Sequence, residues 1–253
     1  MSVITSRDNP RVRGWRALAR DARERRKAGR AIIEGGHLVQ ACLDAGTTIE
    51  SLLIAKSAEA KFEKLVERVD APVVLSDPVF NAIADAESPS GIAAVIVLPV
   101  SKPDLRTAPS CAFLEGIQDA GNVGTILRSA AAFGIGHAVL GPGCADAWSP
   151  KVLRAGMGAH FAVEVLEAGL EEAIGRFGGK LCCTVARGGI ALADADLSGR
   201  VGWLFGSEGQ GVSAALAARA DLKVSIPMPG GAESLNVAAA AAICFHEWSR
   251  RKS

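Results

Sequence analysis

From residue 110 onward, continuous apolar runs alternate with helical patterns, and this alternation limits the fold more than any other feature of the chain. Such runs are typical of strands that are buried on both faces. Strands are expected at residues 111–114, 137–140, 161–166, 181–185, 201–205 and 222–226. Helices are expected at residues 122–133, 150–157, 170–177, 213–218 and 234–248. The pattern predicts a mostly parallel sheet covered by helices on both faces.

A proline-rich segment at residues 98–109 separates this region from a smaller α/β unit. Three prolines in twelve residues indicate an interdomain linker. Before the linker, helices are expected at 36–45, 58–69 and 77–84, and strands at 49–55, 73–75 and 92–98. We therefore expect an N-terminal domain over residues 1–97 and a C-terminal domain over residues 110–253.

The composition favours a globular protein without a membrane segment or a metal. Hydrophobic residues make up 49% of the 253 residues, so a large core can be buried. No apolar run reaches the roughly 20 residues of a membrane-spanning helix, and the N-terminus lacks the pattern of a secretory signal. The six cysteines and four histidines have no spacing suited to zinc. We expect a cytoplasmic protein with free thiols and no metal.

Positive charge is concentrated near the N-terminus, although the whole chain carries a net charge of only +1. Residues 7–30 contain ten basic and three acidic residues, a net charge of +7. Trp15 and Leu18 lie among them at helical spacing, which predicts a helix with one apolar stripe and basic flanks. Charge alone leaves two interpretations open, a phosphate-binding arm and a solvated helix face.

Three clusters of polar residues or glycines follow predicted strands, where ligands of parallel sheets gather. In the first cluster, Asn122 is well placed as the N-cap of the next helix. Arg128 lies one helical turn beyond Gly124 and shares its face. An arginine near such a loop suits phosphate recognition. Helix capping and a surface ion pair would explain this segment equally well.

The second cluster is a glycine turn after the strand at 201–205. Gly206, Gly209 and Gly211 have neither the spacing of a dinucleotide-binding loop nor the lysine of a phosphate loop. Glu208 among them is a poor host for phosphate and a better partner for cations or hydroxyls. A plain tight turn is the alternative interpretation.

The third cluster leads into an alanine-rich helix. Pro227 and Pro229 end the preceding strand, because neither can donate a hydrogen bond to a sheet. Ser234 and Asn236 begin the next helix, where such side chains ordinarily act as caps. The alanines at 238–242 permit close helix packing, either within the fold or across a dimer.

Taken in order, the three clusters resemble the SpoU (TrmH-like) branch of the SPOUT methyltransferases, which methylate the ribose 2′-hydroxyl of RNA. The resemblance covers residues 110–253 and rests on DAGNVGTILR at 119–128, FGSEGQG at 205–211, and IPM and SLNV between 226 and 237. Residues 149–154 also look like a segment of that family. Residues 33–39 look like part of an L30e/L7Ae-type RNA-binding domain.

The resemblance implies a trefoil-knotted α/β domain that binds S-adenosylmethionine, preceded by a smaller L30e/L7Ae-like α/β domain. It also implies a homodimer with the active site near the interface. The implied cofactor-binding residues are Gly206, Gly209, Ile226, Met228 and Leu235. The implied catalytic residues are Asn122, Arg128, Glu208, Ser234 and Asn236. No metal is implied.

The roles of the implied catalytic residues follow from the chemistry of methyl transfer. A guanidinium stays protonated in nearly any protein setting. We therefore expect Arg128 to grip the phosphate next to the target ribose and to orient its hydroxyl, with a phosphate oxygen or solvent taking the proton. Ser234, Asn236 and Glu208 would position ribose and cofactor.

The expected substrate is RNA, with 23S ribosomal RNA favoured by the N-terminal domain. Transfer RNA is one alternative, and a non-catalytic RNA-binding protein that retains the fold is another. The basic arm would then contact RNA, and its candidate residues are Arg7, Arg11, Arg13, Arg25, Arg26 and Lys27. The methylated nucleotide, and a housekeeping as against a resistance role, stay open at this point.

Overall fold

In the computed structural model, which describes residues 3–99 and 104–252, the chain divides into two units. The first contains residues 3–99 and 148–161, and the second contains residues 104–147 and 162–252. Residues 100–103 of the expected linker lie outside the described residues. Leu105 and Ala108, from the same expected linker, are buried in the core of the second unit.

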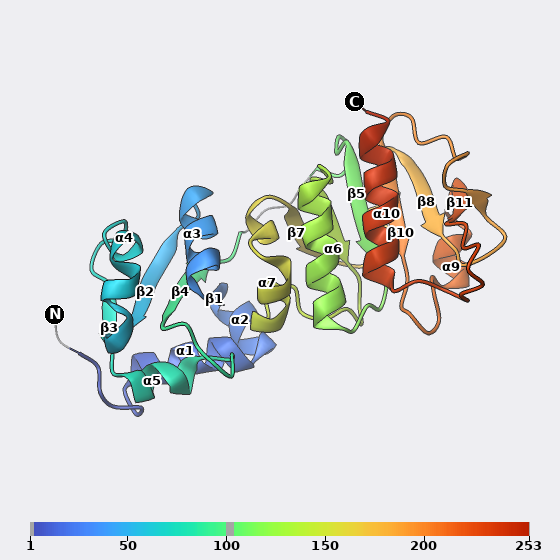
Figure 1. The fold of residues 1–253 in the computed structure, drawn as a ribbon. Helices are drawn as coiled ribbons and strands as arrows, with labels where there is room; N and C mark the ends of the chain where they lie inside the picture. The colour runs from blue at the N-terminus through green and yellow to red at the C-terminus, as the bar shows by residue number, and fades with distance from the viewer. Residues whose placement is uncertain (1–2, 100–103, 253) are drawn as a thin grey trace. The chain divides into compact units, whose positions relative to one another are not determined.

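A four-stranded mixed sheet forms the centre of the first unit (Figure 1). Its strand order is β1-β4-β2-β3. The central strand β4 is antiparallel to both β1 and β2, whereas β2 and β3 are parallel. The strands are β1 (Arg30–Glu34), β2 (Ile49–Ala55), β3 (Val73–Leu75) and β4 (Ile92–Val97).

The helices of the first unit include one that is far away in the sequence. Arg154, on α7, donates a hydrogen bond of 2.7 Å to Asp85, so the 148–161 segment is held to this unit by an ion pair. The α-helices are α1 (Pro10–Arg20), α2 (Ala22–Ala28), α3 (Gly36–Asp44), α4 (Glu63–Val66), α5 (Asp77–Ile83) and α7 (Pro150–Gly156). Short 3₁₀ turns are η1 (Lys56–Ala58), η2 (Ala60–Phe62) and η3 (Ala159–Phe161).

The basic N-terminal segment forms two helices, and the helix expected around Trp15 and Leu18 is α1. Asp21 has an extended backbone and its side chain accepts a hydrogen bond from the backbone N–H of Arg23. It therefore ends α1 and caps α2. The apolar stripe of α1 is confirmed, because Trp15 and Leu18 are buried. The helix expected at 58–69 is likewise broken, into η1, η2 and α4.

Seven parallel strands form the sheet of the second unit, in the order β7-β6-β5-β10-β8-β11-β9. The two central strands β5 and β10 are buried along their whole length, as the continuous apolar runs predicted. The strands are β5 (Ser110–Leu114), β6 (His137–Leu140), β7 (Glu164–Glu167), β8 (Lys180–Thr184), β9 (Ile190–Ala191), β10 (Val201–Phe205) and β11 (Leu222–Ser225).

Helices cover both faces of this sheet (Figure 1). On one face α6 and α10 lie side by side, and Phe205 of the sheet meets Phe245 of α10 at 5.6 Å between ring centroids. On the other face, Phe113 packs edge-on against Phe177 beside α8, at 5.7 Å. The helices are α6 (Ala120–Ala132), α8 (Leu170–Arg176), α9 (Ala214–Ala217) and α10 (Val237–Arg250).

The strand order brings the loops of the three clusters to one edge of the sheet. β10 comes late in the chain but inserts between β5 and β8, and β11 then inserts between β8 and β9. Phe205 is paired with Leu114 across β10 and β5, so these strands end level with each other. Because all seven strands are parallel, the loops at 115–119, 206–213 and 226–236 leave from the same edge.

Candidate active site

Three side chains, one from each cluster, form a closed triangle of hydrogen bonds. Asn122 donates from Nδ2 to Oε1 of Glu208 at 2.8 Å. Asn236 donates from Nδ2 to the same oxygen at 2.8 Å and to Oδ1 of Asn122 at 3.0 Å. The three clusters therefore meet at one point, although 86 residues separate the first from the second.

Asn122 is free to join the triangle because it does not cap its helix, so that prediction was wrong. The N-cap of α6 is Asp119, whose Oδ1 accepts the backbone N–H of Asn122 at 2.8 Å. An aspartate cap three residues earlier satisfies the same orphan N–H groups. The amide of Asn122 can then point out of the helix toward Glu208.

Asn236 links the triangle to the start of α10. Its Oδ1 accepts the backbone N–H groups of Ala238 and Ala239, at 2.9 and 3.2 Å. The side chain thus acts as the N-cap of α10 and holds its amide nitrogen toward Glu208. The expectation that Asn236 begins this helix is confirmed, whereas Ser234 lies two residues before the cap, in the preceding loop.

The glycine loop after β10 is folded tightly on itself. The backbone N–H of Gly211 donates to the carbonyl of Ser207 at 2.8 Å, and Gly211 has a left-handed backbone with φ of 67°. A Cβ at Gly206 would lie 2.0 Å from the carbonyl oxygen of Gly211, so only glycine fits there. Gly209 is different, because a Cβ there would meet nothing within 4 Å.

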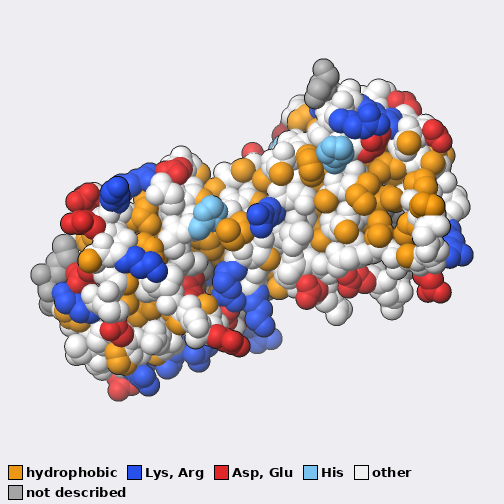
Figure 2. Space-filling view, in the orientation of Figure 1, with side chains coloured by type: hydrophobic (Ala, Val, Ile, Leu, Met, Phe, Trp, Pro, Cys, Tyr) orange, Lys and Arg blue, Asp and Glu red, His pale blue; other side chains and the backbone are white. Residues whose placement is uncertain are grey.

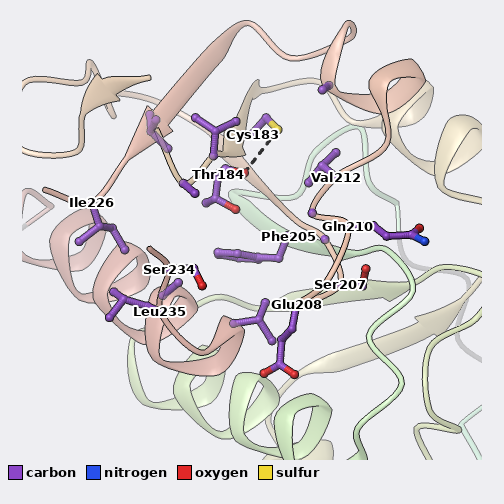
Figure 3. A pocket seen from close by; sticks show the side chains of 18 of the residues that line it. Cys183, Thr184, Phe205, Ser207, Glu208, Gln210, Val212, Ile226, Ser234 and Leu235 are labelled. Carbon is purple, nitrogen blue, oxygen red and sulfur yellow. Dashed lines mark hydrogen bonds between the residues drawn. The ribbon is translucent and has the colours of Figure 1, made fainter. Parts of the chain in front are cut away.

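This loop forms one wall of a cavity of about 440 Å³, which we call the main cavity (Figure 3). All five predicted cofactor-binding residues line it: Gly206, Gly209, Ile226, Met228 and Leu235. Leu235 is 38% exposed, a high value for a large apolar side chain. Ile226 and Leu235 lie together at one side of the cavity, with Phe205 between them and the glycine loop (Figure 3).

The main cavity has the size and lining of a site for a small organic cofactor. Cavities of about 300–1,000 Å³ with apolar walls and a few polar groups are typical of such sites. The glycines at 206, 209 and 211 line the cavity and present only backbone atoms to it. Ser234 and Glu208 contribute polar side chains to the lining.

Several lining residues were not predicted, because they come from strands next to β10. Thr184 lies at the end of β8, and its Oγ1 donates to the carbonyl of Leu204 at 3.0 Å. Cys183 and Val185 also line the cavity, as does Phe205, the last residue of β10 itself. The sequence indicated only that an apolar strand ends near these residues. Which strand lies beside β10 was not visible, since that order depends on long-range pairing.

Arg128 is the predicted catalytic residue that lies apart from the others. It is exposed on α6 and lines neither of the cavities described here. Among the described residues, no side-chain hydrogen bond or ion pair of its guanidinium is found. Asn122, Glu208 and Asn236 lie together in the triangle, and Ser234 lines the main cavity next to Leu235.

A second cavity, also of about 440 Å³, lies on the other side of the glycine loop. It shares the loop residues 207–210 with the main cavity and includes Asn122 of the triangle. Its lining is Gly116, Ile117, Gln118, Asp119, Asn122, Ser207, Glu208, Gly209 and Gln210. We refer to it below as the second cavity.

The residues of the basic arm do not share one environment. Arg7, Arg11, Arg13, Arg26 and Lys27 are exposed. Arg25 is only 4% exposed, and its Nη1 donates to the carbonyl of Leu18 at 2.6 Å. Arg25 therefore ties α2 to α1. Blue side chains gather over the part of the first unit that holds α2 (Figure 2).

The described residues contain neither a membrane-spanning helix nor a metal-binding cluster. Over residues 3–99 and 104–252, every helix is too short or too polar to cross a membrane. Within the described part of the chain, no three His, Cys, Asp or Glu side chains gather as a metal site would require.

Both halves of the chain match family models. Residues 110–246 match the SpoU rRNA Methylase family, and residues 9–94 match the MRM3-like substrate binding domain. The chain is 36% identical to the 23S rRNA (guanosine(2553)-2′-O)-methyltransferase RlmP of Bacillus subtilis, over 97% of this chain and 98% of that protein.

Solved structures resemble the chain over nearly its whole length. The AdoMet-bound rRNA methyltransferase from Sinorhizobium meliloti has a TM-score of 0.86 at 29% identity, over 99% of this chain and 98% of that chain. The SpoU methyltransferase AviRb from Streptomyces viridochromogenes, in complex with AdoMet, has a TM-score of 0.86 at 25% identity, over 96% of this chain and 98% of that chain. These likenesses confirm the expected α/β fold with its smaller N-terminal domain.

Proposed function

We propose, because this chain belongs to the SpoU rRNA methylase family, that its substrate is 23S ribosomal RNA. The chain is an RNA 2′-O-ribose methyltransferase that uses S-adenosylmethionine, as its relatives and structural neighbours are. The observation that carries the proposal is the triangle of Asn122, Glu208 and Asn236 at the rim of a glycine-walled cavity. The choice of 23S RNA rests on RlmP, which the chain matches from end to end.

The main cavity would hold S-adenosylmethionine through its walls. We propose that the backbone at Gly206 and Gly209 binds the polar parts of the cofactor, since both residues line the cavity and the space beside Gly209 is open. Ile226, Met228 and Leu235 would pack against the adenine ring. When bound, S-adenosylmethionine supplies an electrophilic methyl group.

The side chains at the rim would orient the ribose that receives the methyl group. Oε1 of Glu208 already accepts two amide hydrogens, so its Oε2 remains available for a ribose hydroxyl. Asn122 and Asn236 would fix the direction of this carboxylate. Ser234 would donate or accept a further hydrogen bond. Precise orientation of the attacking hydroxyl is a large part of the rate enhancement in such a transfer.

Arg128 would contribute from a second copy of the chain. In a single chain Arg128 is exposed, takes no part in the triangle's hydrogen bonds and lines neither cavity. We propose a homodimer in which Arg128 of the partner subunit reaches the RNA bound at the triangle. Ile243 on α10 is 40% exposed, and hydrophobic side chains gather over this face (Figure 2), which supports an interface there.

The N-terminal half would bind RNA through its basic arm. Of the residues proposed for this contact, we retain Arg7, Arg11, Arg13, Arg26 and Lys27 and withdraw Arg25, because it is buried. We also retain the domain division at 1–97, 98–109 and 110–253, which the two family matches at 9–94 and 110–246 support. A ribosomal substrate would place the protein in the cytoplasm.

One experiment tests the substrate and separates the alternatives. Purified protein is incubated with labelled S-adenosylmethionine and, separately, with unmodified 23S RNA, 16S RNA and transfer RNA, followed by nucleoside analysis. We expect a labelled 2′-O-methylated nucleoside from 23S RNA alone. Label in transfer RNA would instead establish a transfer RNA enzyme. RNA binding without label in any nucleoside would establish a non-catalytic RNA-binding protein.

A further inference from the structure

We propose that the second cavity receives the target nucleoside and that Gln118 and Gln210 read its base. This inference rests on the methyltransferase function proposed above and adds to it the identity of the base. Three observations carry it: the wall that the two cavities share, the charge of the second cavity's lining, and two glutamine side chains without hydrogen-bond partners among the described residues.

The shared wall puts the second cavity where the acceptor must lie. Ser207, Glu208, Gly209 and Gln210 line both cavities. Methyl transfer requires the reacting atoms to approach within about 3–3.5 Å in line. With the cofactor in the main cavity, a ribose at the shared residues Ser207 and Glu208 would lie beside it. Glu208 and Asn122, which line the second cavity, are hydrogen-bonded to each other there.

The charge of the lining favours a nucleoside over a phosphate. The lining residues include the carboxylates Asp119 and Glu208 and contain neither Lys nor Arg. A phosphate placed there would be repelled by both carboxylates. A base and a ribose carry N–H and O–H donors, which carboxylates accept. The cavity thus suits the uncharged part of a nucleotide, while the phosphate lies outside it.

Gln118 and Gln210 are the side chains best suited to recognising a base. Both are exposed, and neither side chain makes a hydrogen bond within the described residues. Gln210 lines both cavities, and its side chain points away from Phe205 (Figure 3). A glutamine amide offers both donors and an acceptor, the combination with which proteins read base edges.

The acceptors around these amides point to guanine. Asp119 uses Oδ1 for the backbone N–H of Asn122, which leaves Oδ2 for a ligand. Guanine presents two neighbouring N–H donors, at N1 and N2, beside the acceptor O6. A carboxylate oxygen and two amides match this set better than they match the single N–H donor of uracil. The relative RlmP is named for a guanosine.

The test compares three glutamine variants of the full-length protein. The variants are Gln118→Ala, Gln210→Ala and the control Gln40→Ala; Gln40 is bonded to Asp44 in the other unit. The substrates are an unmodified 23S RNA transcript, in which the methylated position is first mapped with the wild type, and the same transcript with adenosine there. Calorimetry gives the Kd for S-adenosylmethionine, and initial rates give kcat/KM for each RNA.

We expect the wild type to methylate a guanosine and to prefer it over adenosine. Gln118→Ala and Gln210→Ala should each lower kcat/KM for the guanosine transcript about 10- to 100-fold, the effect of one base contact. Both should reduce the preference over adenosine and melt as the wild type does, and Gln118→Ala, whose side chain lines the second cavity alone, should leave the Kd for S-adenosylmethionine unchanged. Gln40→Ala should behave as the wild type in every measurement.

Three outcomes would overturn the inference. An unchanged kcat/KM in both glutamine variants would show that Gln118 and Gln210 do not recognise the base. An equal loss of kcat/KM on both transcripts would show the same. In either case the proposed methyltransferase function would stand. Ribose methylation of a nucleotide other than guanosine by the wild type would remove the assignment of the base. A wild type that binds S-adenosylmethionine but labels no RNA would instead refute the proposed function itself.

Discussion

Nδ2 of Asn236 lies 2.8 Å from Oε1 of Glu208, and this contact joins the start of α10 to the glycine loop after β10. The same asparagine caps α10 through Oδ1. The oxygen of this side chain therefore stabilises the helix, whereas its nitrogen orients Glu208 in the proposed site. A substitution that keeps the helix cap and removes the hydrogen bond to Glu208 gives the first prediction.

Asn236→Asp should keep the protein stable and lose activity. Aspartate caps helices as well as asparagine does, so the N–H groups of Ala238 and Ala239 stay satisfied. The second carboxylate oxygen, however, has no hydrogen to donate to Glu208. We expect a free energy of unfolding within about 1 kcal/mol of the wild type and a fall in kcat of about 100-fold, measured by denaturation and by methyl transfer. Asn236→Ala should lose both, and an active Asn236→Asp would remove the triangle from the mechanism.

Two glycines of the same loop should respond differently to alanine. At Gly206 the new Cβ would lie 2.0 Å from the Gly211 carbonyl oxygen, whereas at Gly209 it would meet nothing within 4 Å. We expect Gly206→Ala to destabilise the protein by about 2 kcal/mol or more and to abolish S-adenosylmethionine binding. Gly209→Ala should melt as the wild type does and bind the cofactor more weakly. Calorimetry checks both, and unchanged affinity in Gly209→Ala would exclude Gly209 from the cofactor site.

Alanine substitutions at Arg25 and Arg13 should have different effects: the first should lower stability, and the second should weaken RNA binding. The buried Arg25 holds the Leu18 carbonyl, whereas Arg13 is exposed on α1. Arg25→Ala should cost about 1–3 kcal/mol of stability, because a buried carbonyl loses its partner. Arg13→Ala should leave stability unchanged and reduce the slope of log K against log salt by about one. Filter binding at several salt concentrations measures that slope, and an unchanged slope would mean that this part of the arm is a solvated face.

Mixed dimers should reveal whether Arg128 acts across the subunits. Arg128→Ala alone should bind S-adenosylmethionine and transfer almost no methyl. If Arg128 of the partner subunit completes each site, a heterodimer of Arg128→Ala with Asn236→Asp contains one intact site. Random mixing of the two inactive variants should then restore about a quarter of the wild-type activity. An inactive mixture that nevertheless exchanges subunits would place Arg128 in its own chain's site, or outside the mechanism.

Alkaline pH should destabilise the first unit through Cys42. This cysteine is fully buried, and burial raises the pKa of its thiol from 9.0 to about 11. The protonated thiol is favoured by folding, so its contribution is fully present below pH 9 and is lost as the pH rises through 11. We expect a loss of about 2 kcal/mol over that range. Thermal melts from pH 8 to 11 measure it, and the decline should be shallower in Cys42→Ala.

The α/β architecture of the second unit was predictable, because the apolar pattern of each strand can be recognised from neighbouring residues alone. A strand buried on both faces must be apolar at every position, and β5 and β10 have this pattern. Periodicity could not reveal the strand order, since pairing of β10 between β5 and β8 depends on contacts across 20 to 90 residues of chain. The lining residues Thr184 and Val185 were missed for that reason.

Two residues were assigned the wrong environment, because the sequence offered several residues of similar chemistry for one position. Asp119 and Asn122 are both good N-caps, and only the position of Glu208, 86 residues away, shows why the aspartate caps α6. Arg25 looked like its exposed neighbours, because the turn at Asp21 that buries it interrupts the helical period. Composition predicts which residue types gather, whereas burial of a single arginine depends on tertiary packing.

Residues 207–210 of the glycine loop line both cavities, so a single substitution in this loop can alter the choice of target nucleotide. Gly206 is fixed by the backbone it touches and Glu208 by its two amide partners, but Gln210 bonds to nothing in the described structure. A saturation library at position 210 should therefore yield enzymes with altered nucleotide choice. Retargeting such a protein could begin with a single codon.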